Sequence, residues 1–526
     1  MTMFNPKNDV TMKKTYLLAA MALSALAAAA QSGVNLDVYD GAQLTTGDLN
    51  GTARYVGMGG AMEALGADIS TISTNPAGIG MFRSTQASLS LGMVIQGGGS
   101  SFYDGKPVNP SFDQVGVVFS KRTGLQNFLN FGFNFHKSRN FDYVLSAAAG
   151  AVNGSSQNRQ TTIKGVRGDL DTYWGESQVD KLYGDLLSDK DGQMYDIDAT
   201  QYDFNRAHTG YIGDYDFNIS GNINNRVYLG LTIGIKDVHY SGYSEYFETL
   251  SPLTATAPTS VLMSDDHTIS GTGYDIKAGA IFRPIEESPL RFGVSVATPT
   301  WYRLKTSNTT RLGNVLQNGY DANFRFNTPW KFGASVGYTI GTEWALGLSY
   351  EYADYTSNDM RAISESGYDW DGYYYESSES DRELKRSTQL TLRGVSTLKM
   401  GAEYKPVKAL SLRVGYNYVS PMFQKGGQRD QTLNSSAVYM ASTTDYTNWY
   451  ATNRLTAGVG YTMGKLRLDL AYQCSLREGD FYPYMNGLSA GWVDDSGQMH
   501  TLTNECSPVS VKDTRHQLLL TANYTF

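Results

Sequence analysis

Hydrophobic and polar residues alternate along most of this chain, and the clearest example is its C-terminal end. Counting back in twos from Phe526 gives Tyr524, Ala522, Leu520 and Leu518, and the residues between them are mostly polar. Alternation with a period of two places one set of side chains on each face of a β-strand. An apolar face that ends in two aromatic residues is typical of a strand with lipid on one side and a wet lumen on the other. A half-buried strand of a soluble sandwich would have a similar pattern, so this segment alone does not distinguish the two folds.

Fourteen such alternating segments can be recognised. Aromatic residues concentrate at the segment ends, as the aromatic girdles of a membrane barrel require. Charged residues such as Lys277, Arg413 and Asp469 stand in the middle of the polar faces, where a barrel lumen can hydrate or pair them. The segments lie at residues 88–95, 115–120, 129–136, 215–220, 227–236, 274–282, 290–296, 330–338, 344–352, 398–404, 412–418, 455–461, 466–472 and 518–526.

The connections between these segments alternate between short and long. The short ones include Asn222–Asn225, an Asn-rich turn of the kind that tight hairpins use. Short periplasmic turns and long external loops are the pattern of an outer-membrane barrel. The sequence therefore predicts an all-β fold, a transmembrane antiparallel β-barrel of about 14 strands. The long connections are residues 142–209, 247–266, 303–322, 358–388, 423–450 and 479–512.

The N-terminal end carries an export signal. Met12-Lys13-Lys14 is followed by an apolar stretch rich in Ala and Leu that ends in Ala28-Ala29-Ala30. This is the pattern of a secretory signal peptide, and it is too short to span a bilayer as a helix. We expect translation to start at Met12, residues 1–11 to be an extension, and the mature chain to begin near Gln31.

Composition favours one barrel over several soluble domains. The chain has 55 Gly and 37 Tyr but 14 Pro, and no linker-like run divides it. After the signal peptide, no apolar run reaches the roughly 18 residues of a membrane helix. The net charge of −8 argues against a nucleic-acid partner. Cys474 and Cys506 allow one disulfide in an exported chain, and neither has neighbours that suggest a metal site.

The segment between the cleavage site and the first strand, residues 31–84, is rich in Gly and Ala. Its pattern is helical around Met58–Leu65. It breaks at Asn75-Pro76, because Pro76 fixes its own φ and biases Asn75 away from the helical region. A compact, kinked segment of small residues suits a plug inside a barrel. Its glycines do not form G-x-G-x-x-G after a strand, so phosphate binding is not indicated.

The segment Gly66–Gly78 resembles the N-terminal hatch of the FadL/TodX outer-membrane transporters, whose shared mark is an Asn-Pro-Ala element. Fourteen strands and the C-terminal Phe match that family, and the resemblance covers nearly the whole mature chain. Beyond the N-terminal extension plus signal peptide at 1–30, it implies a hatch inside the lumen at 31–84 and a barrel with long external loops at 85–526.

The resemblance also implies passive transport of hydrophobic small molecules, such as long-chain fatty acids or aromatic hydrocarbons. It assigns the gate to Asn75, Pro76, Ala77 and Gly78. It further implies that the ligand leaves sideways at a kink in the third strand, where Gly132 is the only Gly. The longest external loop here is the second, whereas the best-known members dock their ligand on the third and fourth. We therefore transfer no ligand-contact residues.

Other functions remain open. A diffusion porin for polar solutes would need an open lumen, which a plug opposes. A haemin-binding or adhesive surface protein is a further alternative, although the six His residues are scattered without paired spacing. No enzyme is expected, because no nucleophile, base and orienting group stand in a recognisable context. We expect no cofactor and no metal. The expected partners are a hydrophobic ligand, outer-membrane lipid and, during insertion, the barrel-assembly machinery, with the chain a monomer.

Overall fold

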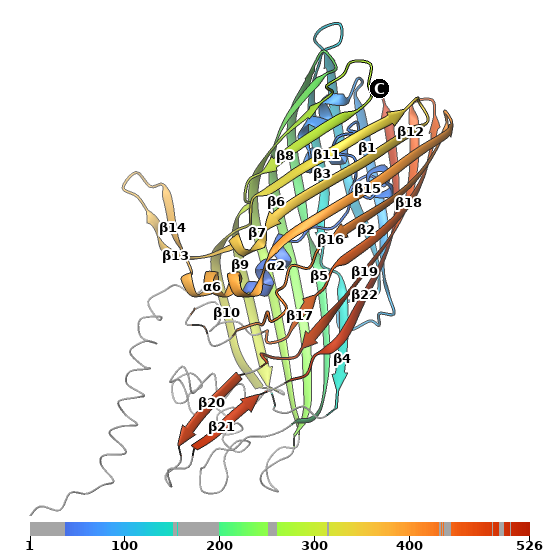
Figure 1. The fold of residues 1–526 in the computed structure, drawn as a ribbon. Helices are drawn as coiled ribbons and strands as arrows, with labels where there is room; N and C mark the ends of the chain where they lie inside the picture. The colour runs from blue at the N-terminus through green and yellow to red at the C-terminus, as the bar shows by residue number, and fades with distance from the viewer. Residues whose placement is uncertain are drawn as a thin grey trace, which may run out of the picture.

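Strands wind around a central lumen in the computed structural model of the chain, and short helices lie inside that lumen (Figure 1). The predicted signal peptide, Gln31 and most of the long connection 142–209 lie outside the described residues. The structure describes residues 37–150, 155, 199–250, 260–312, 315–430, 433, 435, 443–486, 488–493, 499–504 and 506–526.

Within these residues, fourteen strand positions close an antiparallel barrel. The last strand pairs with the first from Gln86↔Thr525 to Gly97↔Thr514. The predicted all-β barrel is therefore confirmed. Some positions hold one continuous strand: β1 (Gln86–Gly97), β2 (Val108–Arg122), β5 (Ala199–Ile223), β6 (Val227–Leu250), β7 (Ser260–Phe282), β16 (Leu410–Val419), β19 (Leu466–Tyr482) and β22 (Val509–Thr525).

At the other positions two strands follow one another. Pro299 and Pro329 cause two of these breaks, because proline has no N–H to donate to a neighbouring strand. The two breaks lie side by side, and Thr328 N donates to Thr300 O at 3.1 Å. The divided positions are β3 (Phe128–Asn140) with β4 (Tyr143–Ala149), β8 (Arg291–Ala297) with β9 (Trp301–Leu312), β10 (Val315–Asn327) with β11 (Lys331–Ile340), β12 (Trp344–Asp354) with β13 (Asp359–Tyr368), β14 (Tyr374–Ser380) with β15 (Gly394–Val407), and β17 (Tyr446–Trp449) with β18 (Thr452–Met463).

The connections carry some structure of their own. The short helix η3 (Tyr355–Ser357) separates β12 from β13, and α6 (Arg382–Thr391) separates β14 from β15. The strands β20 (Leu488–Val493) and β21 (Met499–Asn504) form a separate hairpin.

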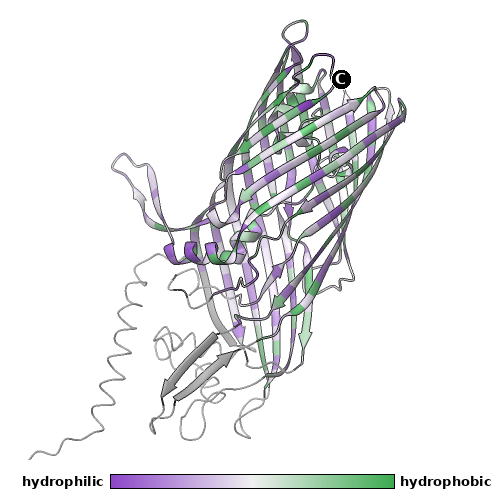
Figure 2. Ribbon diagram, viewed as in Figure 1, coloured by the Kyte–Doolittle hydropathy of each residue, from purple (hydrophilic) through white to green (hydrophobic). Residues whose placement is uncertain are grey.

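The two faces of the wall differ as the alternation predicts. On β6, Leu229 and Ile233 are about half exposed, whereas Thr232 between them is fully buried toward the lumen. The same alternation is visible along the wall strands as green and purple bands (Figure 2). An apolar band therefore surrounds the barrel, and aromatic residues such as Tyr274 and Tyr524 stand at its edges with 53% and 43% of their surface exposed.

Three strands extend far beyond this band. β5, β6 and β7 have 25, 24 and 23 residues, or about 80 Å at 3.3 Å per residue. Residues 303–322, predicted as an external loop, belong mostly to β9 and β10, and residues 358–388 contain β13, β14 and part of α6. These two predictions were wrong. Outside the apolar band the outward face is polar, and the inward face, although buried, mixes apolar and polar residues such as Leu304 and Thr306. The alternation of apolar and polar residues is therefore weak there.

The N-terminal residues fill the lumen as α2 (Val38–Thr45), α3 (Ala53–Gly57) and the 3₁₀ turns η1 (Ile69–Ser73) and η2 (Pro76–Met81). The helix predicted around Met58–Leu65 is wrong, because α3 ends at Gly57. Gly59 and Gly60 have φ angles of 61° and 81°, which a right-handed helix does not allow. None of the helices among the described residues is long and apolar enough to cross a membrane.

Candidate functional site: the hatch and an arginine-lined cavity

The Asn-Pro-Ala element lies against the barrel wall. Asn75 caps η2, because its Oδ1 accepts from Ala77 N at 3.2 Å, and Pro76 takes the first helical position. A methyl group added to Gly230 of β6 would collide with the backbone of Pro76. One added to Gly279 of β7 would collide with the side chain of Asn75. The element therefore fits where the wall has no side chains.

The same relationship continues around the barrel. Wall glycines face the hatch backbone at one level, and side chains at these positions would push the hatch out of place. This gives a structural reason for the glycines at these wall positions. Examples are Gly337 against Ala64, Gly347 against Ala61, Gly401 against Met58, Gly415 against Gly59 and Gly458 against Gly57.

Buried ion pairs also join the hatch to the wall. Glu403 accepts from Arg54 of α3 at 3.1 Å and from Arg413 at 2.6 Å, and Arg413 also reaches Asp469 at 2.8 Å. These are the mid-strand charges that the sequence places in the lumen. Here they are paired with one another and with the hatch. Removing one partner of such a buried pair typically costs about 3–5 kcal/mol.

A second charged group was not predicted. His136, Asp214 and Asp216 bring their ligand atoms within 4.8 Å of one another, as a metal site would require. However, Lys277 Nζ already lies 2.8 Å from Asp216 Oδ1, and Lys236 pairs with Asp214. Two ammonium groups beside these carboxylates favour an ion-pair network over a cation site. The strand register, which the sequence does not show, brings these residues together.

A cavity of about 70 Å³ lies between α2 and the wall. This space holds a few water molecules, so it fits the polar head of a ligand better than a whole lipid. Its apolar lining includes Tyr39, Phe141, Tyr143, Phe423 and Trp449. Its basic lining consists of Arg139, Arg206, Arg429, Arg477 and Arg515.

All but one of these arginines have a carboxylate partner. Arg139 pairs with Asp48 at 3.0 Å, Arg206 with Asp445, Arg429 with Asp37 at 2.6 Å, and Arg477 with Asp513 at 2.8 Å. Arg515 differs from them. Among the described residues it donates to Asn140 O at 3.2 Å and has no carboxylate within 4.0 Å. One guanidinium beside aromatic side chains is suited to an amphipathic anion.

The hatch carboxylates respond differently to these arginines. Burial opposes ionisation of Asp48, but Arg139, Arg515 and Arg454 together hold its pKa well below the usual range. For Asp37, burial outweighs the attraction of Arg429 and raises the pKa to about 6. Next to the cavity, the hatch therefore keeps a permanent negative charge at Asp48 and a titratable one at Asp37.

The wall is incomplete next to this cavity. Pairing of β2 with β3 stops at Gln114↔His136, and β3 itself ends two residues before β4. A second cavity of about 20 Å³ lies there and shares Asn140 and Arg515 with the first. Its other lining residues are mostly polar or charged: Asp48, Asn50, Val94, Asp113, Lys137, Arg454, Gln473, Ser475 and Gln517.

Gln96 of β1 spans part of this gap. Its Nε2 donates to Val144 O at 2.6 Å, and Val144 N donates to its Oε1 at 2.8 Å. Gly132 is on the third strand but below the gap, where an added Cβ would lie 3.2 Å from Ile72 of the hatch. The third strand is therefore irregular at a register shift between Lys137 and Arg139 and at its break at Phe141–Asp142, whereas Gly132 belongs to the surface that receives the hatch.

The two cysteines are free thiols. Cys474 lies on β19 opposite His516, and Cys506 is buried with Tyr202 and Tyr484 in an apolar cluster. The disulfide that the sequence allowed is not formed.

Comparison with known proteins completes this description. No family model and no curated protein matches the chain. Among solved structures, the chain is similar to a Pseudomonas aeruginosa FadL homologue, with a TM-score of 0.51 and 14% identity over 91% of this chain and 100% of the other. The Ralstonia pickettii toluene transporter TbuX gives a TM-score of 0.46, with 12% identity over 91% and 99% of the two chains. The Pseudomonas putida toluene transporter TodX gives 0.45, with 12% identity over 92% and 100%. By its likeness to the first of these structures, the chain has the fold of a FadL-type barrel.

Proposed function

We propose that this chain is a FadL-type outer-membrane transporter for hydrophobic molecules with an anionic head group, of which a long-chain fatty acid is the simplest. The observation that carries this proposal is Arg515, which has no carboxylate partner among the described residues and lines both cavities. An aromatic hydrocarbon could make only a cation–π contact with that guanidinium, without an ion pair. A fatty acid would pair with it while the aromatic residues cover the start of its chain.

The membrane placement has separate support. The apolar band, its aromatic edges and the export signal suit a barrel inserted in the outer membrane by the assembly machinery. The hatch fills the lumen with buried residues, which does not favour a porin for polar solutes.

The proposed route runs from the arginine-lined cavity to the gap between β2 and β3. The head group passes Arg515 and Lys137, both of which line the second cavity. The tail moves into the bilayer, which is favourable by about 0.8 kcal/mol for each CH₂ removed from water. We propose that movement of the Asn75–Gly78 element opens this route. Asn75 Nδ2, a buried donor with no hydrogen-bond partner among the described residues, makes the closed position less stable than it could be.

The test compares uptake of a labelled long-chain fatty acid with uptake of the alcohol of equal length. Cells without another such transporter would express the wild type or Arg515→Gln. We expect the variant to lower fatty-acid uptake about tenfold, the effect of losing roughly 1.4 kcal/mol, and to leave alcohol uptake unchanged. Lys512→Gln is the matched control, because Lys512 is a surface cation on the same strand. Equal effects on both probes would reject the anionic head group, and no uptake of either by the wild type would reject transport.

A further inference from the structure

The hairpin of β13 and β14 carries an unusual group of exposed aromatic side chains at its tip. Trp370 is 94% exposed, and Tyr368, Tyr373, Tyr374 and Tyr375 are between 42% and 75% exposed. The tip is nevertheless ordered. Asp369 N donates to Tyr373 O at 2.9 Å, and Tyr373 N donates to Asp369 Oδ1 at 2.8 Å. Exposed aromatic groups on an ordered turn mark a surface that binds a partner.

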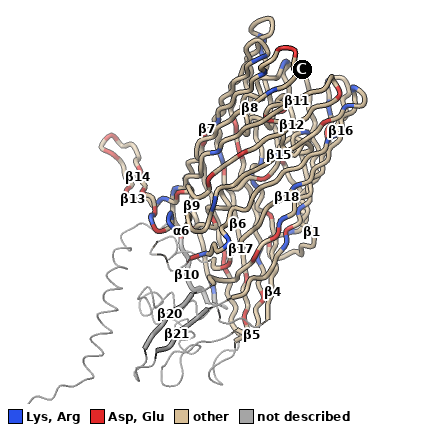
Figure 3. Tube along the Cα trace, viewed as in Figure 1, with Lys and Arg blue, Asp and Glu red and all other residues tan. Residues whose placement is uncertain are grey.

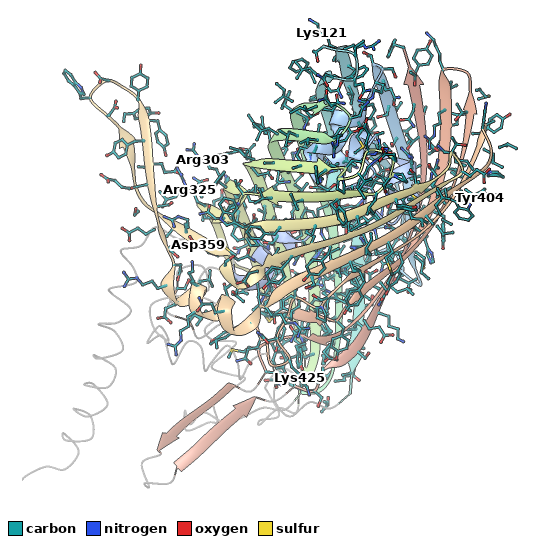
Figure 4. All side chains as sticks on the ribbon, turned by 45° about the horizontal axis from the view of Figure 1, so that its top comes forward. Lys121, Arg303, Arg325, Asp359, Tyr404 and Lys425 are labelled. Carbon is teal, nitrogen blue, oxygen red and sulfur yellow. The ribbon has the colours of Figure 1, made fainter. Side chains whose placement is uncertain are left out.

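The hairpin is also strongly acidic. Residues 362–380 contain five carboxylates and neither Lys nor Arg. Arg325 of β10 pairs with Glu376, which lies opposite Ser366 in the half of the hairpin nearer the tip; Figure 4 labels Arg325. The two carboxylates at the tip, Asp369 and Asp371, flank Trp370. A partner for this surface must therefore supply positive charge.

The helix α6 supplies positive charge on the same chain. Its buried face is fixed by Leu384 and Thr388, and Asp381 caps it by accepting from Leu384 N at 3.0 Å. Its exposed face presents Arg382 and Arg386 together with Leu390, which is 69% exposed. Basic residues at α6 and acidic residues along the hairpin are both visible in Figure 3.

These two surfaces do not reach each other within one chain. β14 has seven residues, so the tip lies about 20 Å beyond the point where α6 begins. In Figures 1 and 4 the tip of the hairpin points away from the barrel wall and from α6. The tip can therefore meet an α6 surface only on another molecule.

We propose that the β13–β14 tip of one copy docks on α6 of a second copy, so that two barrels associate side by side about a twofold axis. Each copy then gives its tip and receives its partner's tip, as a self-complementary interface requires. The guanidinium groups of Arg382 and Arg386 would lie over the rings of Trp370 and its neighbours and pair with Asp369 and Asp371. The side-by-side geometry rests on the membrane placement in the proposed function, but not on the ligand. This proposal departs from the monomer that the sequence led us to expect.

The test is the oligomeric state of the full chain in detergent, measured by native mass spectrometry. We expect the wild type to form dimers that high salt weakens. Asp369→Arg with Asp371→Arg, and separately Arg382→Glu with Arg386→Glu, should each weaken dimerisation at least tenfold. Mixing these two variants should restore it, because each remaining contact then pairs opposite charges. Glu478→Arg, at an exposed position on β19, is the control and should dimerise as the wild type does.

Three results would overturn this proposal: a monomeric wild type, variants that dimerise normally, or a mixture that stays monomeric. Trp370→Ala keeps all the charges and should weaken the dimer as well, so an unchanged dimer would also count against the assigned surface. Quenching of Trp370 by brominated lipid in a bilayer would assign the tip to the lipid surface instead. None of these readouts depends on transport, so the dimer and the transport function can fail separately.

Discussion

Arg429 Nε lies 2.6 Å from Oδ2 of Asp37. Asp37 stands at the start of the hatch, whereas Arg429 lies in the connection between β16 and β17, 392 positions later in the chain. Tyr39 strengthens this contact, since its ring stacks on Phe423 at 4.9 Å and its hydroxyl donates to Asn448 at 2.7 Å. The connection that carries Arg429 therefore holds the first helix of the hatch. A ligand that enters the cavity would contact both the hatch and this connection, because Tyr39 and Arg429 both line the cavity.

Replacing Arg429 by Gln should loosen α2. The change leaves Asp37 buried without its cation, and breaking a buried pair in this way costs about 3–5 kcal/mol. Hydrogen exchange of residues 38–45 should accelerate by two or more orders of magnitude, while the barrel strands keep their protection. Arg393→Gln is the control, because that exposed side chain donates only to Pro421 O. Unchanged exchange in α2 would mean that the hatch is held elsewhere.

Docking of α2 should be tighter at pH 5 than at pH 7.5. Burial raises the pKa of Asp37 to about 6 from an ordinary 3.8. Between these values the docked helix binds a proton that the undocked helix does not, so docking weakens as pH rises to about 6 and then levels off. The effect is at most about tenfold per pH unit. Burial raises the pKa of Asp40 as well, in the same direction.

Hydrogen exchange of α2, corrected for the intrinsic pH dependence, would measure this shift. Asp37→Asn should remove most of it, because the amide does not titrate. An equal pH dependence in that variant would point to another group.

A methyl group at Gly230 should displace the hatch. Gly230→Ala collides with the backbone of Pro76, and overpacking of this kind typically costs about 1–3 kcal/mol. We expect faster swelling of liposomes in small polar solutes, with normal heat-modifiable migration of the barrel. Gly333→Ala is the matched wall variant, because the three atoms nearest to its added methyl group all belong to Ser295 of the neighbouring strand and none to the hatch. Equal swelling for both variants would show that the glycine surface does not position the hatch.

Asn75→Ala and Pro76→Ala should leave the barrel assembled but change uptake of a labelled long-chain fatty acid. Loss of the Asn75 cap costs about 1 kcal/mol, which shifts the hatch away from its closed position without unfolding it. Deleting residues 31–80 should go further and admit small polar solutes. If both point variants assemble and neither uptake nor swelling changes, the element is a structural turn and not a gate.

The sequence by itself determined the strand architecture within the apolar band. Lipid on one face and polar groups on the other impose a period of two, so the strand around Leu229 and Ile233 and the one ending at Phe526 could be recognised directly. It also indicated the break at Asn75-Pro76, because the restriction that proline imposes is local.

Only the tertiary structure decided what the lumen does. Arg139, Arg429 and Arg515 are far apart in the chain and are ordinary polar positions in each segment, but barrel closure and strand register bring them to one cavity. The irregularities in the third strand likewise lie between Lys137 and Asp142 and not at Gly132, because they follow the point at His136 where β2 leaves β3. Outside the apolar band the outward-facing residues are polar, so the alternation is too weak to predict β9, β10 or the β13–β14 hairpin as strands. The alternation of apolar and polar residues indicates only the environment of each strand face, whereas a site depends on which strands pair and in which register.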